Sequence, residues 1–135
     1  MAKRYVNPVI TVNAVDLTDH VASVTINQKY DELDTTVFGT VGGKERIAGL
    51  QDNSLTIEFL QDFAAASVDV TIAALLGTAT TVVVTAGAGA VSVTNPKWTM
   101  SCLLLEWTPI AGAAGDLQKV SVTWPVTGVV TRATA

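Results

Sequence analysis

The residue types that carry out catalysis are scarce in this chain. It has one histidine, His20, and one cysteine, Cys102, far apart in the sequence. A histidine-based metal site needs further ligands, and a nucleophilic cysteine needs a neighbouring group that lowers its pKa. Cys102 stands between Ser101 and Leu103 in an apolar segment, which predicts a small buried side chain. Neither residue indicates an active site.

Two further patterns could bind a ligand, and both are incomplete. Asp31, Glu32 and Asp34 place three carboxylates close together, but the residues that follow do not complete a calcium loop. The run Gly87-Ala88-Gly89 matches half of a dinucleotide-binding fingerprint, without its third glycine and in a strand–loop–strand context. No Walker sequence, nucleophile elbow or paired-histidine metalloprotease motif is present. We therefore expect no enzymatic activity, no cofactor and no bound metal.

The composition indicates a single β-rich domain over residues 1–135. The chain is 49% hydrophobic and 6% aromatic, and only 15% of its residues are charged, against about a quarter in an average domain. Valine and threonine are abundant, and both fit the pleated surface of a sheet. The apolar content excludes a disordered chain, and the single cysteine excludes a disulfide scaffold.

The charge balance argues against tight nucleic-acid binding. Eight basic and twelve acidic residues give a net charge of −4, and the basic residues are scattered along the sequence. Proteins that grip DNA or RNA use lysine and arginine to neutralise phosphates. No apolar run approaches the roughly 18 residues that span a bilayer, and the N-terminus lacks a signal-peptide pattern. We expect synthesis in the cytoplasm and no membrane partner.

Polar and apolar residues alternate in a way that predicts antiparallel strands. Three segments have one aliphatic and one polar face: 21–29, 54–61 and 119–124. Four more are β-branched or apolar: 9–12, 80–85, 98–107 and 126–131. The pattern predicts a mainly β protein with an antiparallel sandwich or barrel-like fold. Pro125 is expected to break or bulge its strand pair.

One segment, 67–76, departs from strand periodicity. Its apolar residues recur at helical spacing, Ser67 suits an N-cap and Gly77 a C-cap. This spacing predicts one short amphipathic helix that covers the open end of the core.

The segment 30–45 is expected to be a long early loop. Loops longer than about 12–15 residues are uncommon in compact domains and are usually functional or disordered. Apolar residues within the loop favour docking onto a partner over disorder. The residues expected to take part are Asp31, Glu32, Leu33, Asp34, Val37 and Phe38.

Three segments together resemble the small major tail proteins of long-tailed bacteriophages, most closely those of phages that infect actinobacteria. The first is 46–59 (RIAGLQDNSLTIEF), which continues to Asp62 and Phe63. The others are 15–21 (VDLTDHV) and 115–125 (GDLQKVSVTWP). The resemblance covers almost the whole chain and rests on the turn from Arg46 to Asp52 and on patterned strands.

The resemblance implies a structural protein of the virion tail. In that family a β-sandwich with one flanking helix assembles into hexameric rings, and the rings stack into a tube that conducts the genome during ejection. One sheet of each subunit joins its neighbours in a continuous inner barrel, and a long early loop reaches the adjacent ring, which here implies 30–45 as the inter-ring loop. Tape-measure and tail-terminator proteins would be further partners, and a tail without a contractile sheath is favoured.

A conduit for DNA needs a wall that does not hold phosphates, so it should be polar and neutral to acidic. The family architecture and the strand alternation together suggest five residues for this wall: Ser23, Thr25, Asn27, Thr56 and Glu58. DNA would pass them without specific binding.

Two other classes of function stay open on the sequence. One is another virion component, such as a capsid-decoration or tail-completion protein. The other is an immunoglobulin-like binding module, which would share the strand pattern. Rings or tubes of the purified protein would separate the tail-tube hypothesis from both.

Overall fold

The structure is a computed structural model that describes residues 8–39, 42–65 and 67–135. Its elements in chain order are the strands and helices β1 (Val9–Val12), β2 (Val15–Asp16), the 3-10 helix η1 (Thr18–His20), β3 (Val21–Asn27), β4 (Tyr30–Asp34), β5 (Arg46–Gln51), β6 (Ser54–Leu60), α1 (Val68–Leu75), β7 (Ala79–Thr85), β8 (Lys97–Leu103) and β9 (Lys119–Ala133).

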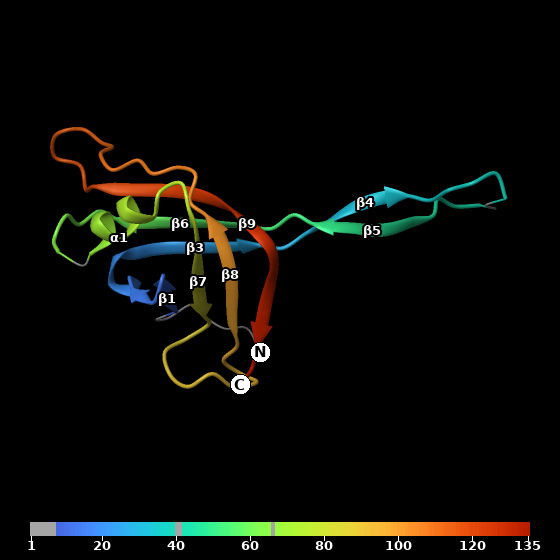
Figure 1. Ribbon diagram of the computed structural model, residues 1–135, viewed down its shortest axis with the longest axis horizontal. Helices are drawn as coiled ribbons and strands as arrows, with labels where there is room; N and C mark the ends of the chain where they lie inside the picture. Colours follow the sequence, from blue (N-terminus) through green and yellow to red (C-terminus); the bar gives the residue numbers. More distant parts are fainter. Residues whose placement is uncertain (1–7, 40–41, 66) are drawn as a thin grey trace.

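Seven strands form one sheet, in the order β2-β1-β7-β8-β9-β6-β3, and every neighbouring pair is antiparallel. The sheet curls into a half-barrel, and α1 lies at one end of it (Figure 1). This arrangement confirms the predicted mainly β, antiparallel sandwich or barrel-like fold with one short helix.

Strand β9 belongs to both halves of the curled sheet. Its residues 119–125 pair with β6, and residues 126–133 pair with β8. Two steps along β8, from Thr99 to Ser101, match four steps along β9, from Thr131 to Thr127. This bulge contains Gly128, whose φ of +86° lies in the left-handed region that glycine adopts without strain. The extra residues bend β9 where it passes from one half to the other.

Pro125 does not interrupt β9, so the predicted break is wrong. The proline lies opposite Ser54, and the next residue, Val126, donates its N–H to the Asn53 carbonyl. Successive residues of a strand direct their backbone groups to opposite edges, so Pro125 lacks its N–H on the edge that faces away from β6. No bond of the β6–β9 ladder is lost.

The core lies on the concave side of the half-barrel. The buried side chains of β6 and β9 include Leu55, Ile57, Phe59, Val120, Val122 and Trp124. Those of β1, β7 and β8 include Ile10, Val12, Val82, Val84, Met100 and Cys102. Helix α1 adds Val68 and Ile72, both fully buried, and so closes one end as predicted.

Helix α1 lies within the predicted segment 67–76. Ser67 occupies the N-cap position, but its side chain makes no capping hydrogen bond. After Leu76 the chain turns at Gly77, which has a φ of +87° and donates its N–H to the Leu104 carbonyl. Residue 66 lies outside the described part of the chain.

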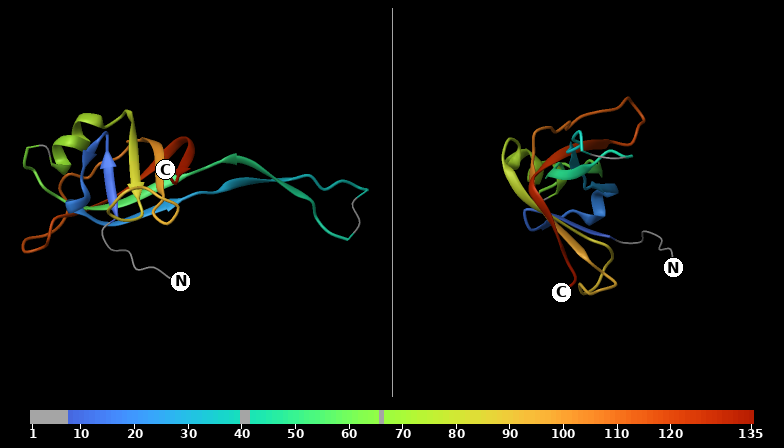
Figure 2. Two further views of the ribbon diagram at one scale, coloured as in Figure 1. Left: turned by 90° about the horizontal axis from the view of Figure 1, so that it is seen from below. Right: turned by 90° about the vertical axis from the view of Figure 1, so that its right-hand side faces the viewer.

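The segment predicted as a loop over 30–45 begins with a β-strand, the first strand of a β-hairpin. Tyr30–Asp34 forms β4, which pairs with β5 in a register that places Leu33 opposite Ile47 and Asp34 opposite Arg46. The hairpin extends the β3–β6 pair away from the half-barrel as an arm (Figures 1 and 2). The prediction of a loop is therefore wrong for residues 30–34, because backbone pairing with β5 outweighs the low strand propensity of the acidic residues. Residues 40 and 41 of the predicted loop lie outside the described residues.

Candidate functional site

The convex side of β3, β6 and the first part of β9 carries a continuous polar face. The register aligns Ser23, Glu58 and Ser121 in one row and Thr25, Thr56 and Thr123 in the next. Asn27 and Ser54 are paired in a third row. All five residues predicted for the tube wall therefore lie on the same face, with their backbone neighbours Val24, Ile26, Leu55 and Ile57 directed to the core side.

The polar face is close to electrically neutral. Its acid, Glu58, lies 3.7 Å from the Lys119 ammonium, measured from Oε1 to Nζ. The hydroxyl groups of Thr56 and Thr123 are 3.1 Å apart and form a hydrogen bond. The candidates missed in the sequence were Lys119, Ser121 and Thr123, although the alternation of 119–124 already placed these three on one side. The arrangement offers hydroxyl groups and one compensated charge pair, and it lacks the clustered cations that capture phosphates.

The arm of β4, β5 and the residues between them exposes large apolar side chains on both strands. Phe38 is fully exposed, Leu50 is 82% exposed and Ile47 is 55% exposed. The full set comprises Tyr30, Leu33, Val37, Phe38, Ile47 and Leu50. Three of these, Tyr30, Ile47 and Leu50, were missed from the sequence because 46–51 was not identified as the partner of a second strand.

Two ion pairs lie on the arm and at its base. Arg46 Nε lies 2.6 Å from Glu32 Oε1, and at the base Lys29 Nζ lies 3.8 Å from Asp52 Oδ2. The Asp34 carboxylate accepts the Thr36 N–H at 2.9 Å, and this hydrogen bond lowers the pKa of Asp34. These contacts tie the acidic residues to the hairpin. Among the described residues no three metal-binding side chains come together.

The two strands of the arm approach each other closely at Gly49. A Cβ atom at this position would lie 3.2 Å from both the Asp31 carbonyl oxygen and Leu33 Cγ. Such contacts are tighter than most side chains accept, so a larger residue at position 49 would push the strands apart.

The two residues with catalytic potential lie in unrelated places. His20 Nε2 is 3.4 Å from Asp62 Oδ2, and both side chains are partly exposed. The N–H of Ala64 lowers the pKa of Asp62. Cys102 is fully buried as predicted, and burial raises the pKa of its thiol to about 12. Within the described ranges, both helices are too short to cross a bilayer.

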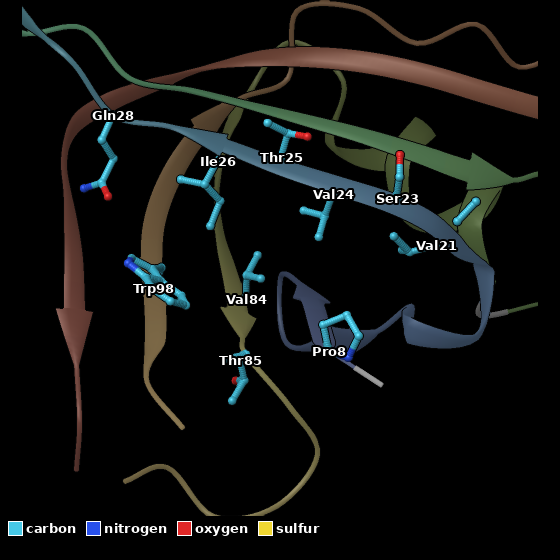
Figure 3. A pocket seen from close by; sticks show the side chains of 12 residues that line it. Pro8, Val21, Ser23, Val24, Thr25, Ile26, Gln28, Val84, Thr85 and Trp98 are labelled. Atoms are coloured by element: carbon cyan, nitrogen blue, oxygen red, sulfur yellow. The ribbon is translucent and has the colours of Figure 1, made fainter. Parts of the chain in front are cut away.

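A cavity of about 680 Å³ lies beside β3 on its concave side. Figure 3 shows Val24 and Ile26 directed into it from β3, facing Val84 of β7 and Trp98 of β8. Pro8 and Gln28 also line it. We call this cavity the groove; its wall is mainly aliphatic and aromatic.

No family model matches this chain, and no curated protein matches it.

Proposed function

We propose that this protein is the subunit of a bacteriophage tail tube. Copies would form hexameric rings, the rings would stack into a tube, and the genome would pass through it into the host. The observation that carries the proposal is the arm, because it presents apolar side chains at a distance from the core of its own chain. The polar face and the free strand edges support it independently.

The exposed apolar side chains of the arm and its lack of further strands support a partner. A two-stranded hairpin without further strands is only marginally stable in water, and nothing in the half-barrel covers this one (Figure 2). Burying one of its large apolar side chains gains about 1.5–3 kcal/mol. Exposed apolar surface of this extent marks a contact with another molecule. A copy in the adjacent ring is the partner that the proposal assigns to it.

The polar face suits the inner wall of the tube. Its hydroxyl and amide groups exchange hydrogen bonds with water, and its one lysine is compensated by Glu58. A phosphate backbone sliding past meets no cluster of cations that would hold it. The net charge of −4 also disfavours binding of the phosphate backbone.

The free strand edge of the half-barrel is suited to pairing with a strand of a neighbouring copy in the ring. Strand β3 has no strand partner on its outer edge within the described part of the chain. A free edge of this kind is a template for pairing with another chain, and closing it in a ring removes the risk of uncontrolled aggregation. Tape-measure and tail-terminator proteins would then contact the finished tube rather than the monomer, and the assembly would be located in the virion tail.

Electron microscopy of the purified chain in negative stain tests the proposal. Rings, and stacked rings or tubes at higher concentration, support it. A trimer would favour a capsid-decoration protein, and a monomer at all concentrations would favour a tail-completion protein or a binding module. Either of these two results would contradict the tail-tube proposal.

A further inference from the structure

The arm and the segment between β8 and β9 lie at opposite ends of the molecule. Strand β6 connects the two ends: its first residue, Ser54, follows the arm, and its last, Leu60, leads toward α1. Figures 1 and 2 show α1 and residues 104–118 at the end away from the arm. The proposed function gives the arm a partner in the adjacent ring, so one surface of that partner must receive it.

The end of the arm carries apolar side chains and one lysine. The Thr36 hydroxyl accepts the Glu45 N–H at 2.9 Å and donates to the Glu45 carbonyl at 3.3 Å. Val37 and Phe38 follow Thr36, and they are 66% exposed and fully exposed. Lys44 directly precedes Glu45 and, among the described residues, joins neither ion pair of the arm and its base. We call Val37, Phe38 and Lys44 the tip of the arm.

Hydrogen bonds fasten the segment between β8 and β9 to the end of the half-barrel that carries α1. Trp107 Nε1 donates to Asp69 Oδ1 of α1 at 3.3 Å. Gln61 Nε2 donates to the Pro109 carbonyl at 2.7 Å, and the Gln61 N–H donates to the Gln118 carbonyl at 2.9 Å. The segment therefore forms one surface with α1 and with the chain that follows β6.

Large apolar side chains are exposed on this surface. Ile110 and Leu117 are 79% and 65% exposed, and Phe63 and Val70 are about half exposed. We call the following residues the end surface: Phe63, Val70, Leu105, Ile110 and Leu117. Single exposed apolar residues are ordinary, but several on segments bonded to one another mark a contact with another molecule.

The segments that form the end surface are acidic. Residues 61–78 and 104–118 contain four carboxylates and no lysine or arginine. The four are Asp62, Asp69, Glu106 and Asp116. The tip of the arm offers Lys44, a cation outside both ion pairs of the arm and its base. The tip and the end surface therefore share apolar character and carry charges of opposite sign, which favours their encounter.

The length of the arm lets its tip reach well beyond its own half-barrel. Residues 28–38, extended at about 3.3 Å each, carry Phe38 up to about 33 Å from the base of the arm. The seven residues of β6 span about 23 Å by the same measure. A copy that lies further along this axis in the same orientation presents the end that carries α1 to the tip.

We propose that the end surface receives the tip of the arm of a copy in the adjacent ring. Val37 and Phe38 would pack among the exposed apolar side chains of the end surface, and Lys44 would approach its carboxylates. The inference rests on the proposed function for the stacked rings and adds the surface on which each arm docks.

The contact joins two different surfaces at opposite ends of the molecule, so it is heterologous. A heterologous contact that does not close by rotation repeats along one axis without limit. Stacking needs a contact of this kind, because each added ring must present a free surface for the next. Arms that bound other arms would stop growth after two rings.

Cross-linking between two single-cysteine variants of the full chain tests the contact. Gly39→Cys lies beside the tip and leaves Phe38 in place, and a Cβ atom at position 39 has no neighbour within 4 Å. Its partner is a tagged Ala111→Cys, which leaves Ile110 in place. The native Cys102 is buried, so a short bismaleimide reacts with the introduced thiols. We expect dimers that contain one copy of each variant.

Two controls replace Ala111→Cys. Val93→Cys places the thiol in the loop between β7 and β8, where Val93 is 78% exposed. Ala22→Cys places it in the groove, a second apolar surface of the half-barrel. Ala64→Cys, next to Phe63, is a second variant beside the end surface in case Ala111→Cys folds poorly.

Mixed dimers with either end-surface variant, at least about tenfold above both controls, support the contact. Adding Ile110→Ser and Leu117→Ser to the Ala64→Cys chain should reduce their yield about tenfold. Mixed dimers that form as readily with Ala22→Cys or Val93→Cys overturn the contact. An unchanged yield with the two serines, or dimers of Gly39→Cys alone, would overturn it as well.

The result is separable from the proposed function. Tubes without these cross-links would refute the docking of the tip on the end surface and leave the tail-tube proposal standing. Cross-linked head-to-tail chains without rings would do the reverse.

Discussion

The side-chain hydroxyls of Thr56 and Thr123 lie 3.1 Å apart across the β6–β9 pair, in the middle of the polar face. The two hydroxyls share one hydrogen bond, which leaves one hydroxyl hydrogen and several oxygen lone pairs of this pair to bond with water. Further along the same face, the negative charge of Glu58 is compensated by the positive charge of Lys119. A surface that is hydrated through its hydroxyl groups, and whose one lysine is compensated by a carboxylate, is suited to let a polyanion slide.

The first prediction concerns this face. Replacing Thr56 and Glu58 by lysine adds two cations and removes the partner of Lys119, so tubes of this variant should bind DNA with a strong dependence on salt concentration. Genome ejection from particles that carry the variant should slow or stop. The checks are DNA binding to purified tubes at several salt concentrations and an ejection assay. Val93→Lys is the charge control, and normal ejection with both lysines would refute the assignment of the wall.

The second prediction concerns the arm. Leu33→Ser and Phe38→Ser remove exposed apolar groups, so the free energy of unfolding of the monomer should change by no more than about 0.5 kcal/mol. Stacking of rings should be lost, because the apolar anchors would no longer be buried against the next ring. Urea denaturation and sedimentation measure the two effects separately. Val93→Ser should retain stacking, and long tubes from the double variant would show that the arm is not the stacking contact.

The third prediction concerns the bend of β9. Gly128→Ala forces a residue with a Cβ atom to adopt a φ of +86°, although no neighbouring atom lies within 4 Å of that Cβ. The penalty is therefore conformational and should lower the free energy of unfolding by about 1–2 kcal/mol. Gly43→Ala is the matched control, because its backbone is outside the left-handed region and its surroundings are open. Equal stability of the two variants in urea would contradict this account of the bulge.

The fourth prediction follows from the pKa of Cys102, which burial raises from 9.0 to about 12. The folded state holds the thiol proton more tightly than the unfolded state. The thiol therefore contributes stability that is complete below about pH 9 and is lost as the pH rises toward 12. The free energy of unfolding should fall more steeply above pH 9 in the native chain than in Cys102→Ala. Parallel pH profiles of the two proteins would disprove the linkage.

Alternation in the sequence predicted the antiparallel strands wherever a strand packs against the core. Val24, Ile57 and Val122 occupy one row on the core side, and their polar neighbours form the polar face. The same reasoning failed on the arm, because a hairpin without a core has no buried face and so no period-two pattern. Both faces of its strands carry apolar residues, and acidic residues also lie on both faces. Only the backbone pairing identifies residues 30–34 and 46–51 as strands.

The end of β8 and the continuity of β9 were missed for a different reason. Sequence periodicity continues β8 to residue 107, yet the strand ends at Leu103. The Leu104 N–H donates to the Thr78 carbonyl and the Leu104 carbonyl accepts the Gly77 N–H, at the point where β7 begins and β8 ends. Pro125 was expected to break or bulge its strand pair, but its missing N–H faces away from β6 and the ladder continues past it. Such effects depend on tertiary neighbours that no local pattern contains.

The most direct test of the central claim is a three-dimensional reconstruction of the assembled protein by electron cryomicroscopy. The tail-tube proposal predicts stacked rings, with Thr25, Thr56 and Thr123 on the channel wall and each arm seated on a copy in the adjacent ring. An assembly with these threonines on its outer surface, or with arms projecting into solvent, would contradict it.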